Sequence, residues 1–254
     1  MVGAVLIAGA AGGVWAWGPR RADPRPPGEP EGASLRAGPP DAAWCAAVGA
    51  LPVDRQLAAV SAKLRELNPG YDGQVTRYGT HAGRINEFGL HTDAVTDLRP
   101  LRAFTGLVSL TAVGTEPGRG KLTDLGPLRG LPLTVLNVWR NPDLADLSPV
   151  RGAKLVLFQA GDTAVEDLAP LSGMPLHTLA VDNCRVRDLA PVRTMPRLNF
   201  VRCDGCPIAS LEPLVGSTVR ELTFTPDPAR GDDAVLDRAK VKTVNRMNLR
   251  PGKE

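Results

Sequence analysis

The sequence is short of aromatic residues and nearly balanced in charge. Only 4% of its 254 residues are Phe, Trp or Tyr, against 43% hydrophobic residues in all, so any core must be mainly aliphatic. The formal net charge is +3, and this small excess gives no electrostatic footprint of the kind that nucleic-acid-binding proteins carry. The few aromatic residues predict an aliphatic core, and the small net charge predicts that the protein has no nucleic-acid partner.

Residues that usually build metal and nucleophilic sites are scarce as well. The three histidines, His81, His91 and His177, lie far apart, and the four cysteines do not form the disulfide framework of a small secreted domain. Cys203-x-x-Cys206 has no second cysteine pair and no nearby histidine to complete a zinc site. The chain also lacks a glycine-rich phosphate loop and a Ser, His, Asp order. We therefore expect a protein that is not an enzyme and that needs no metal and no cofactor.

An apolar segment opens the chain. Residues 1–17 are uncharged, and Arg20 and Arg21 follow them. The segment is shorter than the roughly 20 residues of a spanning helix, and it lacks the basic start of a secretory signal. A membrane anchor, a cleaved signal and a mis-started gene are all compatible with it. We expect a membrane-anchored or exported protein. Its sidedness stays open, because the two arginines favour a cytoplasmic C-terminal side whereas export would place the repeats outside the cytoplasm.

A linker and a cap follow the apolar segment. Residues 18–41 contain seven prolines and almost no apolar side chains, which predicts a disordered linker. Residues 42–84 then predict two helices, the second with Asp54 as its N-cap, and a hairpin with strands at 74–78 and 84–91. Such a unit covers the open end of a repeat array, so Trp44 is expected to be a core residue.

From residue 85 onward the chain is repetitive, with units of 21 to 26 residues. Three apolar positions recur in each unit. They are Ile85, Phe88, Leu90; Leu107, Leu110, Ala112; Leu133, Leu136, Val138; Leu155, Phe158, Ala160; Leu176, Leu179, Val181; Leu198, Val201, Cys203; and Val219, Leu222, Phe224. An Asp-Leu-x-Pro phrase follows five of the units, beginning at Asp97, Asp124, Asp146, Asp167 and Asp188, with a degenerate copy at Ser210. This is the leucine-rich-repeat pattern.

The pattern predicts an α/β fold, a right-handed β-solenoid of about seven coils over residues 85–225, with a C-terminal cap and tail at 226–254. The three apolar positions point inward, and burying each is worth roughly 1.5–3 kcal/mol. Asn141, Thr163, Cys184 and Cys206 are expected to turn the chain out of each strand. Each repeated Asp is expected to be the N-cap of a 3₁₀ turn or short helix on the convex side, with the Pro in its first turn. Residues 114–121 lengthen one unit and predict a loop at the rim.

The repeated phrase D-L-x-P-L resembles the internalin-like class of bacterial leucine-rich repeats. The box Asn68-Pro69-Gly70-Tyr71-Asp72-Gly73, placed between the helices and the array, resembles a bacterial module often fused behind a serine/threonine protein kinase and a transmembrane helix. The resemblance covers roughly residues 44–248. The kinase motifs themselves are missing from this chain. The resemblance implies the solenoid fold more firmly than it implies a function.

Candidate binding residues come from the strand positions that lie between the buried ones. These positions form the concave face of such a solenoid, where partners usually bind. Exposed Trp and Arg are enriched among binding hot spots, which singles out Trp139. The candidate residues are Asn137, Trp139, Arg140, Gln159, His177, Asp182, Phe200, Arg202 and Asp204.

We therefore expect a non-enzymatic module that binds a protein or peptide ligand on its concave face. The alternative is a structural scaffold, or the sensory fragment of a receptor-type kinase gene, without an independent partner. The identity of the ligand and the oligomeric state do not follow from the sequence.

Overall fold

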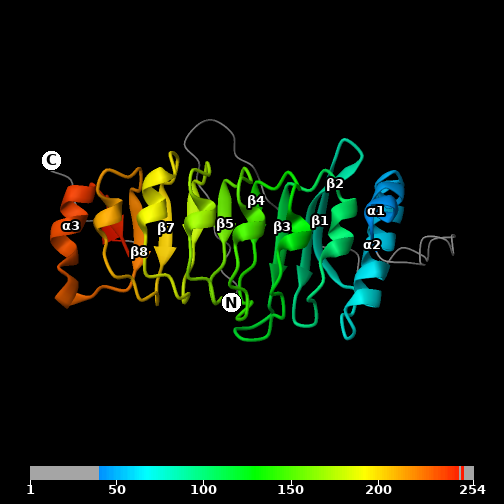
Figure 1. The fold of residues 1–254 in the computed structure, drawn as a ribbon, viewed down its shortest axis with the longest axis horizontal. Helices are drawn as coiled ribbons and strands as arrows, with labels where there is room; N and C mark the ends of the chain where they lie inside the picture. The colour runs from blue at the N-terminus through cyan, green and yellow to red at the C-terminus, as the bar shows by residue number, and fades with distance from the viewer. Residues whose placement is uncertain (1–39, 246, 249–254) are drawn as a thin grey trace.

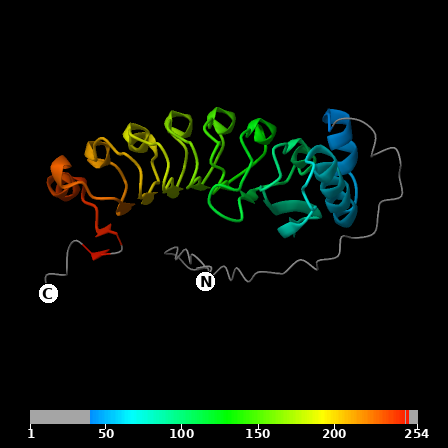
Figure 2. The ribbon, with the colours of Figure 1, turned by 90° about the horizontal axis from the view of Figure 1, so that it is seen from below.

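The computed structural model describes residues 40–245 and 247–248, which form a curved solenoid. Figure 2 shows the strands along the inner edge of a shallow arc and the short helical turns along its outer edge. Figure 1 shows the strands side by side, and their order in the sheet is the chain order from β1 to β10. The predicted leucine-rich-repeat fold is thus confirmed.

One sheet of ten strands forms the concave face in the described part of the chain. Neighbouring strands from β2 to β9 are parallel, whereas β1 and β10 pair antiparallel at the two ends. The strands are β1 (Val75–His81), β2 (Arg84–His91), β3 (Ser109–Val113), β4 (Val135–Asn137), β5 (Leu157–Gln159), β6 (Thr178–Ala180), β7 (Phe200–Cys203), β8 (Glu221–Phe224), β9 (Thr243–Val244) and β10 (Met247–Asn248). The parallel sheet therefore continues past residue 225, where the repeat pattern in the sequence fades.

The core consists of the three apolar columns. Every residue of the seven predicted triplets is at most 3% exposed. Aromatic residues contribute little, and the pair Phe88 and Phe104, with ring centroids 5.2 Å apart, lies near the N-terminal end. Because each coil alone cannot bury its apolar face, the stability of the array comes from contact between neighbouring coils.

The convex side carries one short 3₁₀ turn in each coil. These turns are η2 (Arg99–Ala103), η3 (Gly126–Leu128), η4 (Ser148–Val150), η5 (Ala169–Leu171), η6 (Ala190–Thr194) and η7 (Glu212–Leu214). The predicted capping by Asp is shifted by one residue. The N-cap of η5 is Leu168, and the carboxylate of Asp167 accepts a hydrogen bond of 2.7 Å from the backbone N–H of Ala169. This is an Asx turn, which satisfies the first N–H of the turn from just outside it.

Polar side chains in the turns after the strands satisfy buried backbone groups, as predicted. Asn141 is fully buried, donates to the carbonyl oxygens of Ala112 and Val138, and accepts from the backbone N–H of Leu122. In later coils, the side chains of Cys184 and Cys206 donate to carbonyl oxygens of the preceding coil. Asn141, Cys184 and Cys206 therefore join neighbouring coils at this turn, whereas the hydroxyl of Thr163 donates to a carbonyl oxygen of its own coil.

Helices α1 (Ala42–Gly49) and α2 (Val53–Leu67) cover the first coil. Asp41 caps α1, but α2 begins after Pro52 without a side-chain cap, so the expectation that Asp54 is the N-cap of the second helix was wrong. Trp44 is buried, as predicted. At the other end, α3 (Asp232–Ala239) follows the short turn η8 (Pro228–Arg230) and lies beside η7.

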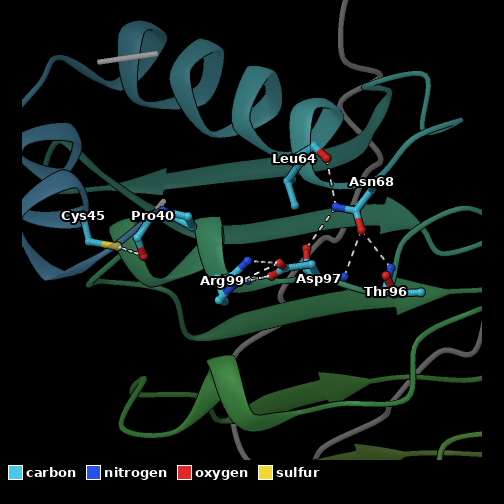
Figure 3. A network of polar contacts seen from close by, with 7 residues as sticks. All are labelled: Pro40, Cys45, Leu64, Asn68, Thr96, Asp97 and Arg99. Atoms are coloured by element: carbon cyan, nitrogen blue, oxygen red, sulfur yellow. Dashed lines mark hydrogen bonds and ion pairs between the residues drawn. The ribbon is translucent and has the colours of Figure 1, made fainter. Parts of the chain in front are cut away.

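Asn68, the first residue of the Asn-Pro-Gly-Tyr-Asp-Gly box, ties α2 to the first convex turn (Figure 3). Its amide nitrogen donates to the carbonyl oxygens of Leu64 and Asp97, at 2.8 and 3.0 Å. Its amide oxygen accepts from the backbone N–H groups of Thr96 and Asp97, both at 2.9 Å. The side chain is 1% exposed, so this box fixes the cap on the array through a buried, fully bonded amide.

The predicted membrane-anchored or exported location needs correction. In residues 40–245 and 247–248 no helix is both long enough and apolar enough to cross a bilayer. The apolar residues 1–17, on which that prediction was based, lie outside the described residues, as do residues 18–39 of the predicted linker and residues 249–254 of the predicted tail.

Candidate binding face

Three columns of outward-pointing residues run along the concave side of the sheet. The register of the parallel strands places Asn137 beside Gln159, Gln159 beside Ala180, and Ala180 beside Arg202. The same register places Phe200 beside Thr178, in the neighbouring column. The concave columns therefore share one surface, and the candidate residues lie within the strands β4 to β7 or within three residues of their ends.

Trp139 extends along this surface from the end of β4 across the next coil. A Cβ atom at Gly161 would lie 2.6 Å from Cε2 of the indole ring, so the ring occupies the space that a side chain at position 161 would fill. Gly161 is buried as a result, whereas Trp139 remains half-exposed. The orientation of Trp139 thus depends on a glycine in the next coil.

Asp162 fixes the other edge of the indole. Its Oδ2 accepts a hydrogen bond of 2.7 Å from Nε1 of Trp139, and its Oδ1 accepts one of 2.8 Å from Nδ2 of Asn183. Asp162 has a backbone φ of 54°, a left-handed conformation that Asp and Asn tolerate better than most residues. Equivalent left-handed residues are Arg140, Asn183 and Gly205. The left-handed bend recurs in successive coils and gives these residues equivalent places along one rim of the face.

Arg202 lies over the ring of the same indole. Its guanidinium carbon lies 5.3 Å from the centroid of the Trp139 ring, within the range of a cation–π contact. Its Nη2 lies 3.1 Å from Oδ2 of Asp182. Ala180, the neighbour of Arg202 in the register of the sheet, is fully buried. Trp139, Asp162, Asp182 and Arg202 therefore form one cluster, which we call the Trp139–Arg202 cluster.

The carboxylate of Asp182 is less exposed than its sequence position suggested. Its side chain is only 5% exposed, although it belongs to a concave column. Oδ1 accepts from the backbone N–H of Asp204 at 3.3 Å, whereas Oδ2 has its ion pair with Arg202 but receives no hydrogen bond from the described residues. Burial raises the pKa of Asp182, and the opposing effect of Arg202 does not cancel this shift. The expectation of an exposed Asp182 was therefore wrong.

The other predicted residues differ in how closely they adjoin the cluster. Oδ1 of Asn137 accepts a hydrogen bond of 3.1 Å from the backbone N–H of Trp139, so Asn137 supports the bend that projects the indole. Gln159 and Asp204 are half-buried beside the cluster, and Phe200 is half-buried in the adjoining column. These residues form the edge of the face.

Two predicted residues lie apart from the cluster. Arg140 directs its guanidinium to the carbonyl oxygen of Thr115, at 2.7 Å, and so braces the loop of residues 114–121. His177 precedes β6, and its backbone bonds to Val156 and Asn199 place it in a row before the strands. Both were predicted on the same surface as Trp139, but the side-chain bond of Arg140 and the place of His177 before its strand separate them from the cluster.

Gly161 and Asp162 were missed by the sequence analysis. Gly161 is part of a concave column, yet it has no side chain to suggest a contact, and Asp162 follows the last concave position of its coil. One signal was available in the sequence: Gly161 occupies the position that Trp139 occupies in the preceding coil. A large side chain on a solenoid face needs a small neighbour in the next coil.

Cysteine and metal chemistry find no support in the described coils. All four cysteines are buried and free of disulfide bonds. Burial raises the pKa of the Cys206 thiol to about 12 and raises that of Cys203 further. Within residues 40–245 and 247–248, no group of three or more His, Cys, Asp or Glu side chains is placed to hold a metal ion.

Comparison with known proteins places the chain by its fold. A scan against protein-family models and a search of curated proteins both find no match. Among solved structures, an internalin (inlF) from Listeria monocytogenes is similar, with a TM-score of 0.54 and 16% sequence identity. That similarity covers 76% of this chain and 58% of the internalin, so the chain spans just over half the length of that protein.

Two further Listeria monocytogenes structures are less similar. Internalin C2 (inlC2) has a TM-score of 0.33 and 19% identity, covering 65% of this chain and 92% of that one. The functional domain of InlJ has a TM-score of 0.30 and 13% identity, covering 67% of this chain and 55% of that one. The similarity to inlF shows an internalin-like leucine-rich-repeat fold. It does not bear on the resemblance to modules that are fused to kinases, which stays a prediction.

Proposed function

We propose that this protein is a non-enzymatic binding module and that it engages a protein or peptide partner on the concave face of β4 to β7. The observation that carries the proposal is the meeting of Trp139 and Arg202 over the small residues Gly161 and Ala180. Trp is among the residue types most enriched at hot spots of protein interfaces, and here the contact with Arg202 holds its ring in place.

The arrangement of the cluster favours binding because its side chains are already held in place. The indole of Trp139 is fixed by a hydrogen bond to Asp162 and by its contact with Arg202, which in turn pairs with Asp182. Side chains that are ordered before a partner arrives lose less conformational entropy on binding. A rigid aromatic anchor on a rigid sheet is therefore suited to recognition.

The surface beside the cluster supplies the apolar area that a peptide or protein interface also needs. Val135, Leu157 and Phe200 belong to one column of the register and are half-buried, so each leaves part of its side chain accessible. An interface commonly combines such an apolar patch with a polar rim. The concave face of β4 to β7 presents both within a few strands.

A capture experiment with matched variants tests the proposal. The immobilised full chain is incubated with native lysate, and recovered proteins are quantified for wild type, Trp139→Ala and Arg151→Ala. Arg151 follows η4 on the other side of the coil and is exposed, so it controls for nonspecific effects. Loss of a hot-spot Trp costs about 2 kcal/mol or more, so the Trp139→Ala variant should bind its partner at least roughly 30-fold more weakly.

The result also distinguishes the proposal from a scaffold role without an independent partner. Under the proposal, Arg151→Ala recovers the same proteins as wild type and Trp139→Ala does not. Equal recovery by wild type and Trp139→Ala would exclude this face as the binding surface. Recovery of nothing specific by any bait would favour the scaffold role.

A further inference from the structure

Resting on the proposed function, the charge balance of the Trp139–Arg202 cluster indicates which chemical group of a partner the face recognises. The carboxylate of Asp162 bonds to the indole, that of Asp182 pairs with the guanidinium of Arg202 over the same ring, and the backbone N–H of Asp204 donates to Asp182. Three acidic residues and one guanidinium are therefore linked through this group of contacts. The cluster therefore has an excess of negative charge around an aromatic ring.

The three carboxylates differ in how far their hydrogen-bonding capacity is used. Both oxygens of Asp162 accept hydrogen bonds, from Trp139 and Asn183. Oδ2 of Asp182, nine-tenths buried, receives no hydrogen bond from any described residue, although it is paired in charge with Arg202. For the carboxylate of Asp204, the described residues show neither a hydrogen bond nor an ion pair. Neither the buried Oδ2 of Asp182 nor the carboxylate of Asp204, beside the cluster, therefore accepts a hydrogen bond from a described residue.

Arg202 is the one cation that the described residues place on this surface, and it serves two partners at once. It lies against the ring of Trp139 and 3.1 Å from Asp182, but it is still 27% exposed. Its position demonstrates that a guanidinium fits between an aromatic face and a carboxylate here. A second guanidinium could compete for the same contacts, since a planar fork of donors both stacks on an indole and bonds to carboxylates.

We propose that the Trp139–Arg202 cluster binds an arginine side chain of the partner, with Asp204 and Asp182 accepting hydrogen bonds from the incoming guanidinium and Trp139 stacking against it. Arg202 acts as an internal competitor that holds the site in shape when no partner is bound. The buried acceptor at Asp182 and the unpaired carboxylate of Asp204 are then satisfied in the complex.

The effect of removing Arg202 depends on the charge of the partner's group. For an acidic partner, removal of Arg202 weakens binding, because the cation of the Trp139–Arg202 cluster is lost. For an arginine of the partner, removal of Arg202 strengthens binding, because a competitor for Trp139 and Asp182 is lost. The sign of this effect separates the two kinds of partner.

The test uses the ¹⁵N-labelled full chain and three blocked pentapeptides, Gly-Gly-X-Gly-Gly with X as arginine, citrulline or glutamate. The readout is the Nε1–H resonance of Trp139, one of four tryptophans in the chain, assigned by its loss in a Trp139→Phe variant. Citrulline has nearly the shape of arginine without its charge, so it isolates the contribution of the cation.

We expect the arginine peptide to shift the Trp139 resonance in a saturable way, and the citrulline and glutamate peptides to leave it unchanged. Asp204→Asn should weaken binding of the arginine peptide about tenfold, and Arg202→Gln should tighten it several-fold. Asp204→Asn is nearly isosteric and removes a carboxylate that holds no other described group, so it tests the proposal even if Arg202→Gln does not fold.

Three results would overturn the inference: no shift with the arginine peptide, equal binding by Asp204→Asn, or a shift with the glutamate peptide alone. If capture of the native partner still depends on Trp139 in these cases, the concave face remains the binding surface and only the assignment of an arginine side chain of the partner is wrong. If the arginine peptide binds but capture is independent of Trp139, the cation site stands and the proposed function does not.

Discussion

Arg202 of β7 lies over the indole ring of Trp139, which follows β4, with two strands between them. The contact spans the surface of β5 and β6 because Gly161 has no side chain there and Ala180 has only a methyl group. A solenoid places residues from different coils on one concave face, and these two long side chains extend across that face to meet. This relationship is the basis for the predictions that concern binding.

Gly161→Ala is expected to disrupt the cluster without unfolding the protein. The new methyl group would lie 2.6 Å from the indole of Trp139, so the ring must move away from Asp162 and Arg202. The backbone at 161 is not left-handed, and the displaced ring is half-exposed, so the free energy of unfolding should change by less than about 1 kcal/mol.

Two measurements check this prediction. The Nε1–H resonance of Trp139 should move, and capture of the partner should fall as far as it does for Trp139→Ala. In a Trp139→Ala background the glycine substitution should have no added effect on capture. An unchanged Trp139 resonance in Gly161→Ala would contradict the described packing.

Asp182→Asn should change how stability depends on pH. Burial raises the native pKa of Asp182 above its unfolded value, so folding favours the protonated carboxyl. Relative to the unfolded chain, wild type therefore loses stability as the pH rises through the native pKa, and this loss is absent below the unfolded pKa. Because Asn cannot ionise, the stability of wild type relative to Asp182→Asn should fall between pH 4 and pH 7. Urea unfolding at both pH values measures this difference, and a constant difference would contradict the prediction.

Asp232 should show the opposite dependence. Its carboxylate accepts from Nε and Nη2 of Arg230, at 2.6 and 2.8 Å, and from the backbone N–H of Asp227 at 3.1 Å. The hydrogen bonds from Arg230 hold the pKa of Asp232 below its usual value. The stability from Asp232 is thus present above its unfolded pKa and is lost as the pH falls through the depressed native value.

Asp232→Asn is expected to cost about 1.5–3 kcal/mol at pH 7, the range for hydrogen bonds to charged groups, and less at pH 3. Asp233→Asn is the control, because Asp233 is an exposed neighbour in the same helix turn. Chemical denaturation at the two pH values gives both numbers. An equal loss for the two variants would show that the Arg230–Asp232 pair does not secure the C-terminal end of the array.

Cys206 should tolerate replacement by serine better than by alanine. Its thiol donates to the carbonyl oxygen of Val181 at 2.9 Å, and Cys184 makes the equivalent bond to Ala160 one coil earlier. At the same turn position, Thr163 uses a hydroxyl to donate to a backbone carbonyl, that of Ala160 in its own coil. Serine keeps a donor at this position, whereas alanine leaves the Val181 carbonyl without it. Cys206→Ala should therefore be less stable than Cys206→Ser by about 1 kcal/mol in thermal or urea unfolding. Alanine equal to or better than serine would mean that the thiol serves only as an apolar filler.

The solenoid could be predicted from the sequence because apolar residues recur at the same positions of each repeat. Inward columns such as Leu176, Leu179 and Val181 recur at fixed spacing, and no other fold buries that pattern so simply. The Asp residues were predicted to cap the convex turns, and they do so one residue earlier than expected. A carboxylate reaches the first N–H of a turn from either place, so spacing alone could not distinguish them.

The candidate site was harder to predict because it depends on contacts between coils. Trp139 and Arg202 were singled out by residue type, but their meeting depends on side-chain directions that the repeat does not encode. Asp182 was expected to be exposed, yet Arg202 and the neighbouring coils leave it buried. Gly161 makes room for the indole of Trp139 because it has no side chain. A search of the sequence for reactive or binding side chains does not find such a residue.

The most direct test of the binding face is site-specific photo-crosslinking with native lysate. Benzoylphenylalanine is placed at Asn137 on the concave face in one variant and at Arg151 after η4 in another. The account predicts a specific crosslinked protein from position 137, prevented by excess wild-type protein but not by excess Trp139→Ala protein, and no such product from position 151. A specific product from position 151 alone, or competition by Trp139→Ala equal to that by wild type, would contradict it.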